Sequence, residues 1–165
     1  MGLPFEVIMG NENKLSENFS LKEMTDSNTA IRLNINNTPS LQYTSNLIVL
    51  CNEVLEPVRK HFSKPVKVSS GFRCAKLNAA INGAKLSQHT LGQAADIEIA
   101  GIPNKVLAKY IQDNLDFDQL ILEYYVDGIP NSGWVHVSYN EGNNRKEVMK
   151  ASLVSNKLTY THIKL

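Results

Sequence analysis

The sequence has few cysteines and little that would organise a disulfide-bonded fold. Cys51 and Cys74 are the two cysteines among 165 residues, and they form no Cys-x-x-Cys pair. This count and spacing exclude a disulfide framework. We interpret Cys51 as a core residue of a helix and Cys74 as a small residue beside a helix start. A bridge between the two is the less favoured alternative.

A long hydrophobic run is also missing. No stretch of the sequence approaches the roughly 18 apolar residues that a membrane-spanning helix needs. The first residues, Met-Gly-Leu-Pro-Phe-Glu, do not combine a basic region with an apolar stretch and a cleavage site, so they predict no signal peptide. We therefore expect a protein without a membrane partner or an export signal of its own, held in the cytoplasm until another event releases it.

The sequence also lacks a large excess of positive or negative charge. The formal net charge is +1 and no run of Lys or Arg stands out, which argues against a nucleic-acid partner. The length of 165 residues suits one domain with a single core. No linker or repeat divides the chain, so we expect an irregular N-terminal segment over 1–17 and one monomeric domain over 18–165.

The first part of the chain predicts a short helix and a loop. Ser20 and Glu23 have the spacing of a capping box, in which each side chain bonds to the backbone N–H of the other residue. The box predicts a helix near 21–27. Residues 28–39 are rich in Asn and Thr, and this composition predicts a loop.

The longest predicted helix follows Ser40, which is suited to cap its first turn. Apolar residues recur at helical spacing through 41–62, and this stripe predicts a helix that faces the core. Pro57 lies inside the pattern. Because proline lacks a backbone N–H, we expect it to bend the helix or to end it early.

Strands dominate the rest of the sequence. Period-two and short apolar patterns predict strands over 65–71, 94–100, 117–125, 134–139 and 147–153, and the tail 156–165 is a candidate edge strand. Short helices are expected over 75–81 and 103–114, with a polar loop over 83–91. The fold class is therefore α+β, with a small antiparallel sheet and helices packed on one side of it.

Two of the four histidines lie in unusual surroundings. His89 lies in the polar loop, and Asp96 follows inside a predicted strand. Because successive side chains of a strand point to opposite faces, Asp96 points away from the isoleucines of its strand. By the same alternation, His136 points away from its two flanking valines. Both side chains are thus expected outside the apolar core.

A hairpin is expected to bring a carboxylate toward His136. The segment 126–133 is rich in turn residues and joins two predicted strands. If their pairing is centred between Ile129 and Pro130, Glu123 faces His136 on the same side of the sheet, with the Cβ atoms about 5 Å apart. A shift of one residue would separate the two side chains, so this expectation depends on the register.

The chemistry of this residue set favours a zinc site. Two imidazoles and a carboxylate suit zinc, and three protein ligands leave a fourth position for water. Zinc lowers the pKa of that water and polarises a carbonyl group, and Glu123 is then the candidate general base. Two plainer interpretations stay open. A histidine in a strand is often structural, and Glu123 suits an exposed strand position or a partner for a lysine.

The motif formed by these residues resembles that of a known peptidase family. Ser87-x-His89-x-x-Gly92-x-Ala94-x-Asp96, followed by Trp134-Val135-His136, is similar to the signature of the zinc D-Ala-D-Ala carboxypeptidase family, which includes phage endolysins that cut L-Ala-D-Glu bonds. The resemblance extends from about Asn18 to about Arg145. It implies a zinc site in a cleft on the sheet, with His89, Asp96 and His136 as ligands of one ion. It also implies hydrolysis of a peptide bond in peptidoglycan.

The resemblance assigns roles around the ligands as well. Arg73 matches an arginine that binds a substrate carbonyl or carboxylate, with a surface salt bridge as the alternative, and Ser87 matches the motif serine of the ligand loop. One position departs from the family pattern. Many members have the catalytic acid three residues before the last histidine ligand, where this sequence has Gly133. The base must then come from elsewhere, with Glu123 as the first candidate and Asp127 as the second.

Loops are expected to complete the cleft. We expect the segments 28–39, 126–133 and 140–146 to line it. Arg145, in the last of these, is a candidate contact for a substrate carboxylate, with a surface role as the alternative. His61 and His162 match no motif position, and we interpret both as structural or exposed.

Three functions compete, in the following order of preference. The first is a zinc metallopeptidase that cuts the peptidoglycan stem peptide, as a D,D-carboxypeptidase or as an endolysin-type endopeptidase. The second, favoured by Gly133, is a catalytically silent module that keeps the metal and binds the cell wall. The third is a phage structural component. The expected lack of an export signal suits a phage lysis enzyme or a virion-borne enzyme.

Overall fold

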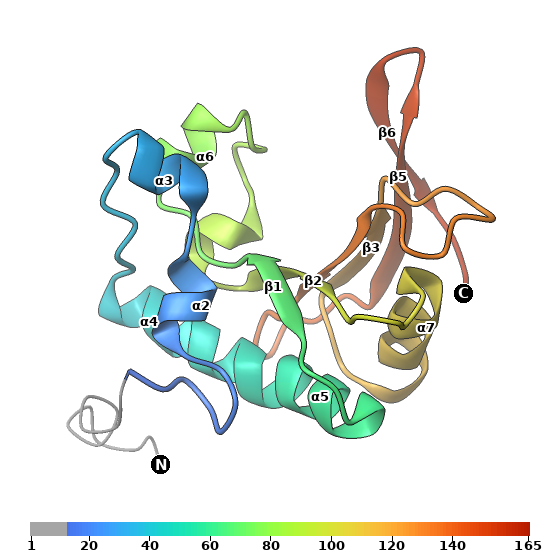
Figure 1. Cartoon of the computed structure of the whole chain (residues 1–165), viewed down its shortest axis with the longest axis horizontal. Coiled ribbons are helices and arrows are strands. Elements are labelled where there is room, and N and C mark those ends of the chain that lie inside the picture. The colour runs from blue at the N-terminus through green and yellow to red at the C-terminus, as the bar shows by residue number, and fades with distance from the viewer. Residues whose placement is uncertain (1–12) are drawn as a thin grey trace.

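The computed structural model describes residues 13–165 and contains both helices and strands (Figure 1). The helical elements are α2 (Leu21–Thr25), α3 (Asn28–Arg32), α4 (Leu41–Leu50), the π-helical turn η1 (Cys51–Leu55), α5 (Glu56–Phe62), α6 (Ala75–Ala80), the 3-10 turn η2 (Gln88–Leu91) and α7 (Asn104–Asn114). The strands are β1 (Lys67–Ser70), β2 (Ala94–Glu98), β3 (Gln119–Glu123), β4 (Trp134–Ser138), β5 (Glu147–Val154) and β6 (Lys157–His162). These elements confirm the α+β class.

The long helix predicted after Ser40 is continuous but changes its hydrogen-bond pattern midway. The Ser40 side chain accepts a hydrogen bond from the Tyr43 N–H and so caps α4. The alternative that Pro57 ends the helix early is wrong. Pro57 lies in the first turn of α5, directly after η1, where the Glu56 N–H bonds to the Cys51 carbonyl. This wider turn accommodates the missing N–H of the proline, so the helix continues.

In the segment 13–40, α3 is a helix that the sequence did not predict. α2 begins at the expected capping box, in which Ser20 and Glu23 each accept a hydrogen bond from the backbone N–H of the other. The segment 28–39, predicted to be loop, contains α3. The reason is a second N-cap, because the Ser27 side chain accepts a hydrogen bond from the Ala30 N–H.

The packed domain starts before the predicted boundary at residue 18. Residues 1–12 of the predicted irregular segment lie outside the described residues. Of the remainder, Leu15 is buried in the main core. Glu56 accepts hydrogen bonds from the Ser16 hydroxyl and from the Asn18 N–H, each at 2.6 Å. The segment around Leu15 is therefore part of the domain and is attached to the start of α5.

The six strands form one sheet in the order β1-β2-β4-β3-β5-β6. Four neighbouring pairs are antiparallel, whereas β3 and β5 are parallel. The parallel pair extends the predicted antiparallel sheet in a way that the sequence pattern did not indicate, because a strand pattern does not specify its partner. β6 is the edge strand that the tail 156–165 predicts.

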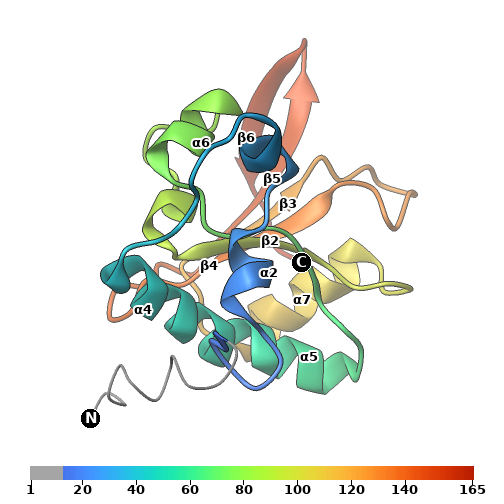
Figure 2. The ribbon, with the colours of Figure 1, turned by 60° about the vertical axis from the view of Figure 1, so that its left-hand side comes forward.

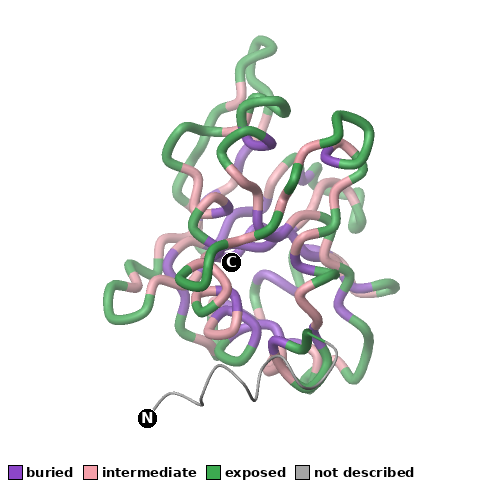
Figure 3. Tube along the Cα trace, turned by 90° about the vertical axis from the view of Figure 1, so that its left-hand side faces the viewer, coloured by how far each residue is buried: buried purple, intermediate pink, exposed green. Residues whose placement is uncertain are grey.

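One face of the sheet packs on helices, and the other face forms the floor of a cleft. The strand side chains that face the helices pack with apolar residues of α4, η1, α5 and α7 in the main core. These strand residues are Ala95, Ile97, Leu120, Leu122, Val135 and Val137. Figure 2 shows α4, α5 and α7 gathered below the sheet, and Figure 3 shows buried residues, in purple, at the centre of the molecule. The prediction of helices packed on one side of the sheet is confirmed.

The hairpin of β3 and β4 pairs differently from the prediction. Glu123 pairs with Trp134, and Ile121 pairs with His136. The predicted pair of Glu123 with His136 is therefore wrong by two residues, because the turn is centred one residue earlier. Side chains alternate with a period of two, so this shift keeps both residues on the same face. Glu123 is a diagonal neighbour of His136 instead of a direct one.

Both cysteines are free. Cys51 is buried in the main core, and Cys74 caps α6 by accepting a hydrogen bond from the Leu77 N–H. These positions agree with the preferred interpretation over a bridge. Within residues 13–165, no helix combines the length and the apolar character needed to cross a bilayer.

Candidate metal centre

Three ligand-type side chains converge on the cleft face of the sheet. His89 comes from η2, Asp96 from β2 and His136 from β4, and all three are buried. Asp96 and His136 are direct partners in the β2–β4 pairing. The two nearest nitrogens, His89 Nε2 and His136 Nδ1, are 3.2 Å apart. Asp96 Oδ1 lies 3.0 Å from His136 Nδ1 and 3.3 Å from His89 Nε2. We call these three residues the triad.

The donor atoms of the triad fit a bound metal ion. In a tetrahedral site with bonds of roughly 2.0–2.1 Å, neighbouring ligand atoms lie about 3.3 Å apart. The three observed separations, 3.0 to 3.3 Å, are at or just below this value. Two imidazole nitrogens and one carboxylate oxygen are also the ligand types that zinc takes in proteins. The triad is therefore arranged as three corners of a tetrahedral metal site.

The backbone around His89 fixes its orientation. Its Nδ1 lies 2.7 Å from the Gly71 carbonyl oxygen and donates its proton there, which leaves the lone pair of Nε2 facing the other ligands. The Ser87 side chain accepts a hydrogen bond from the His89 N–H and so caps η2. At the other end, Gly92 has a φ of +70°, and a Cβ there would overlap the Tyr43 carbonyl oxygen. Ser87 and Gly92 thus shape the ligand loop.

The charges of the triad suit a cation. Burial lowers the pKa of His89 and holds the ring neutral. Burial opposes the ionisation of Asp96, but both histidines outweigh it, so the pKa of Asp96 lies well below its usual value. Burial also lowers the pKa of His136, and its contact with Asp96 reverses this and raises the pKa above the ordinary value. The ionised Asp96 and the neutral His89 ring are in the ligand state that a divalent cation requires, whereas His136 would release its proton to bind the ion.

Glu123 lies next to the triad without joining it. Its Oε1 is 3.8 Å from His136 Nδ1, and its side chain is 17% exposed. Burial raises the pKa of Glu123, and the negative charge of Asp96 raises it further. A partly exposed carboxyl group with a raised pKa beside a metal site is suited to exchange protons with water.

Gly133 has a backbone conformation that leaves no room for a side chain. The residue has a φ of +61°, and a Cβ there would overlap the Glu123 carbonyl oxygen. Any larger residue would strain this backbone conformation. The second candidate, Asp127, is exposed and pairs with Lys150 at 2.9 Å, outside the cleft lining. Among the described residues that line the cleft, Glu123 is therefore the one carboxylate outside the triad.

Arg73 lies in the cleft and forms no salt bridge with any residue of 13–165. Its Nη1 donates to the Ser70 hydroxyl at 3.1 Å, and its Nη2 donates to the Ser87 hydroxyl at 3.3 Å. Its Nε is buried without a hydrogen-bond partner among residues 13–165. Asp96 and Glu123 act on it only as charges at longer range. A guanidinium group held by two hydroxyls in this way is available to bind a carbonyl or a carboxylate.

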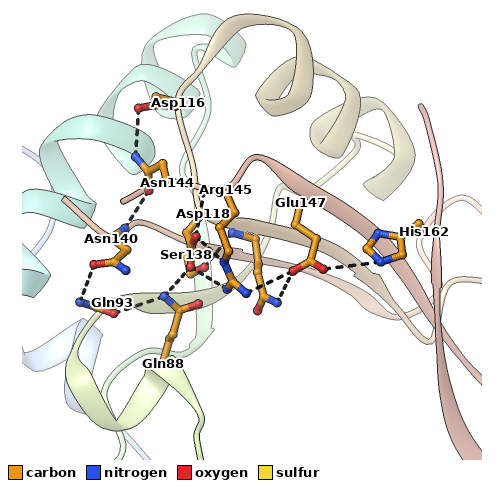
Figure 4. Close-up of polar contacts among 11 residues, drawn as sticks. Gln88, Gln93, Asp116, Asp118, Ser138, Asn140, Asn144, Arg145, Glu147 and His162 are labelled. Carbon is orange, nitrogen blue, oxygen red and sulfur yellow. Dashed lines mark hydrogen bonds and ion pairs between the residues drawn. The ribbon is translucent and has the colours of Figure 1, made fainter. Parts of the chain in front are cut away.

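Arg145 also reaches the cleft, but other protein groups bind its guanidinium. Its Nε and Nη2 donate to the two carboxylate oxygens of Asp118 at 2.8 and 2.9 Å, and its Nη1 lies 3.6 Å from Glu147 Oε2. Asp118 also accepts a hydrogen bond from the side chain of Gln88, the neighbour of His89 (Figure 4). Arg145 is thus part of a structural link, and its role in substrate binding stays a prediction.

The cleft over the triad has a volume of about 730 Å³, and its lining differs from the prediction. Of the predicted loops, 140–146 contributes Arg145, whereas 28–39 and 126–133 contribute nothing. The segment 81–88 and residues of β5 and β6 line the cleft in their place. The alternation of apolar side chains in β5 and β6 was the available sequence signal, but it identifies cleft residues only once the strand order is known.

The remaining histidines lie outside the cleft lining. His61 stacks on Tyr110 with ring centroids 3.9 Å apart. His162 is exposed, with Nε2 3.6 Å from Glu147 Oε1. Both positions agree with the interpretation of these histidines as structural or exposed.

A buried His-Asp-His triad in an open cleft, with a glutamate and an arginine beside it, has the parts of a metal-dependent hydrolase. Comparison with known families gives the same result, since the family described as Peptidase M15 matches residues 17–138. The chain belongs to this family of zinc D-Ala-D-Ala carboxypeptidase-like peptidoglycan metallopeptidases. A search among curated proteins found no match. The resemblance seen in the sequence is confirmed, and the protein is a metallopeptidase.

Proposed function

We propose that this protein binds one zinc ion through His89, Asp96 and His136 and hydrolyses a peptide bond of the peptidoglycan stem peptide. The observation that carries the proposal is the position of Glu123, with its carboxylate 3.8 Å from a triad nitrogen and open to the cleft. Zinc bound at the triad would lower the pKa of a water molecule to about 7 and polarise the scissile carbonyl.

The side chains around the triad would each have one task in this reaction. Glu123 accepts a proton from the attacking water as the new C–O bond forms, and it delivers that proton to the amine that leaves when the C–N bond breaks. Arg73 binds a carbonyl or carboxylate oxygen of the peptide and orients it, while Ser87 holds both Arg73 and the ligand loop.

The finer activity is either that of a D,D-carboxypeptidase or that of an endopeptidase of the endolysin type. Both use the same triad and base, so the bond that is cut depends on how the peptide lies in the cleft. We further propose a role in phage lysis, as an enzyme held in the cytoplasm until release or carried on the virion. The motif that resembles the phage-associated branch of the family supports this role.

The test is the release of free amine from purified muropeptides by the zinc-loaded full chain. We expect turnover by the wild type and a loss of about 10³-fold or more in Glu123→Gln, because the amide cannot accept the proton. Zinc content should be the same in both proteins. Glu141→Gln, which changes an exposed glutamate outside the cleft lining, is the matched control and should keep full activity.

The second candidate is a catalytically silent module that binds zinc and the cell wall. The glycine at position 133, where many relatives have an acid, is the observation in its favour. The same assay separates the two functions. Affinity for muropeptides without amine release in the zinc-loaded wild type would support the silent module and contradict the peptidase.

A further inference from the structure

One wall of the cleft lies beyond the part of the chain that matches the family. The match ends at residue 138, whereas Arg145, Met149, Leu158 and Tyr160 also line the cleft. The last three belong to the β5–β6 hairpin, which projects from the sheet in Figure 1. The triad, Glu123 and Arg73 all lie inside the matched part, so this hairpin adds a feature that the family match does not describe.

Strand pairing brings the hairpin side chains into rows with the site. Glu123 pairs with Ala151, and Ala151 pairs with Tyr160, so these three side chains form one row on the cleft face. Ile121 and Met149 pair in the next row. Ala151, between them, is fully buried, and Glu123 and Tyr160 line the cleft on either side of it.

The hairpin wall is apolar next to the triad. Ile121, Met149 and Ala151 form a small buried cluster separate from the main core, and Leu158 packs against it. Ile121, Met149 and Leu158 also reach the cleft surface. An apolar surface of this kind favours contact with an aliphatic part of a ligand, because the contact removes apolar area from water.

Tyr160 gives this wall one polar group. The residue is 51% exposed. Burial raises the pKa of the phenol, and the nearby Glu123, Tyr124 and Asp96 raise it further. Tyr160 lines the cleft, so its phenolic hydroxyl is a hydrogen-bond donor on this wall.

The wall and Arg73 lie at opposite ends of the cleft. In the strand order β1-β2-β4-β3-β5-β6, Arg73 follows the first strand and Tyr160 lies in the last. Asp96 and His136, on β2 and β4, lie between them. A peptide that crosses the triad would meet a cation at one end and an apolar surface with a hydroxyl donor at the other.

We propose that Tyr160, Met149 and Leu158 form a substrate-binding wall that selects a small aliphatic side chain of the stem peptide, opposite the end bound by Arg73. Met149 and Leu158 contact the aliphatic group, and the Tyr160 hydroxyl donates a hydrogen bond to a peptide carbonyl. This inference rests on the proposed stem-peptide substrate, but it concerns binding and does not depend on turnover.

The first test compares Tyr160→Ala and Tyr160→Phe with Thr161→Ala. Thr161 is exposed on the same strand, and its side chain points to the other face, so it is the matched control. The probe is a synthetic stem pentapeptide ending in D-Ala-D-Ala, bound to zinc-loaded full-length protein in the Glu123→Gln background. We expect Tyr160→Ala to raise Kd about tenfold and Tyr160→Phe about threefold, with no change in Thr161→Ala.

The second test measures selection. A second pentapeptide carries glycine in place of each alanine. For each protein, the Kd of the glycine peptide is divided by the Kd of the alanine peptide, and this ratio is compared between Leu158→Ala and the protein that retains Leu158. We expect the Leu158 side chain to favour the alanine peptide by about tenfold, and Leu158→Ala to bring the ratio close to one. A loss of stability alone would weaken the binding of both peptides equally and leave the ratio unchanged.

The outcomes separate the wall from the proposed activity. Equal Kd values for Tyr160→Ala and Thr161→Ala, an unchanged ratio in Leu158→Ala, or no binding of the pentapeptide at all would overturn the wall. If binding follows the expected pattern but the zinc-loaded wild type cuts no bond, the wall stands and the peptidase proposal fails. On an active wild type, Tyr160→Ala should raise KM more than it changes kcat.

Discussion

At position 133 the chain adopts a φ of +61°, and a Cβ there would overlap the carbonyl oxygen of Glu123. The same residue thus lacks an acid and allows β4 to start close behind the end of β3. Glu123 pairs with the next residue, Trp134, and its carboxylate lies 3.8 Å from His136 Nδ1. The glycine is therefore in close backbone contact with the glutamate that we propose as the base.

We predict that Gly133→Ala destabilises the protein by about 2–3 kcal/mol, as strain in the backbone adds to the overlap with Glu123. Gly128→Ala is the matched control, since Gly128 has a φ of +86° and nothing within 4 Å of the added Cβ. Gly128→Ala should lower the free energy of unfolding by about 1 kcal/mol. Urea unfolding measures both, and equal losses in the two variants would refute a close contact at position 133.

A second prediction concerns Arg73. Removal of its guanidinium by Arg73→Ala should lower kcat/KM on a stem peptide by about 100-fold, with zinc content unchanged, because a substrate oxygen loses a charged partner. Arg32→Ala, on the exposed end of α3, is the control. If Arg73→Ala behaves like Arg32→Ala, then Arg73 does not bind the substrate.

The sequence was a good guide to single residues whose face on a strand decides their role. Alternation alone predicted that Asp96 and His136 leave the core, and both reach the triad. It also kept Glu123 on the correct face. The conformation of Gly133 and the hydroxyl contacts of Arg73 were beyond such reasoning, because they depend on segments that meet only in the folded chain.

At the scale of elements, Asp118 joins three parts of the chain that border the cleft. Its carboxylate is 1% exposed and binds the side chain and N–H of Arg145, before β5, and the side chain of Gln88 in η2. Its own N–H donates to the Ser138 carbonyl at the end of β4. The ligand loop is thereby attached to the strands that carry the rest of the site.

This link predicts a dependence of stability on pH. Its hydrogen bonds with Arg145 lower the pKa of Asp118 in the folded protein. The stabilisation is therefore fully present above the unfolded pKa of roughly 4 and is lost as the pH falls through the folded pKa. Asp118→Asn should lower the free energy of unfolding by about 2 kcal/mol at pH 7, a moderate value because Arg145 is partly exposed and solvent screens its charge. The loss should be smaller at low pH.

Thermal or urea unfolding across the range from neutral to acidic pH measures this difference. Asp26→Asn, at an exposed ion pair with Lys22, is the control and should follow the wild type at each pH. A difference between Asp118→Asn and the wild type that stays constant down to acidic pH would contradict the role given to the Asp118 carboxylate.

Most elements were predictable from periodicity and caps, and the failures have physical causes. α3 depends on one local cap at Ser27 within a polar segment. The hairpin register depends on where the turn closes, which the several turn residues of 126–133 leave undetermined. The parallel pairing of β3 with β5 depends on the order of strands in space. The hairpin wall of the cleft was missed for that same reason.

At the scale of the whole molecule, the two faces of the sheet have different roles. Helices cover one face with the main core, while the other face carries the triad and the cleft. The triad connects η2, β2 and β4, so a bound metal ion would hold together segments distant in the sequence. Metal binding and folding are therefore expected to be coupled.

We predict that zinc at about 1,000 times its Kd stabilises the protein by about 4 kcal/mol, which corresponds to a rise in Tm of about 10 °C. A chelator should reverse the rise. His136→Ala should melt at the same temperature with and without zinc, while His162→Ala, which changes an exposed histidine outside the triad, should respond as the wild type does. A zinc response that survives His136→Ala would place the metal elsewhere.

The most direct test of the central claim is mass spectrometry of muropeptides after incubation with the zinc-loaded protein. We predict products in which one stem-peptide bond has gained one water molecule, formed by the wild type and absent with Glu123→Gln. The position of the new terminus would identify the bond. Muropeptides that remain intact in the presence of fully zinc-loaded wild type would contradict the account.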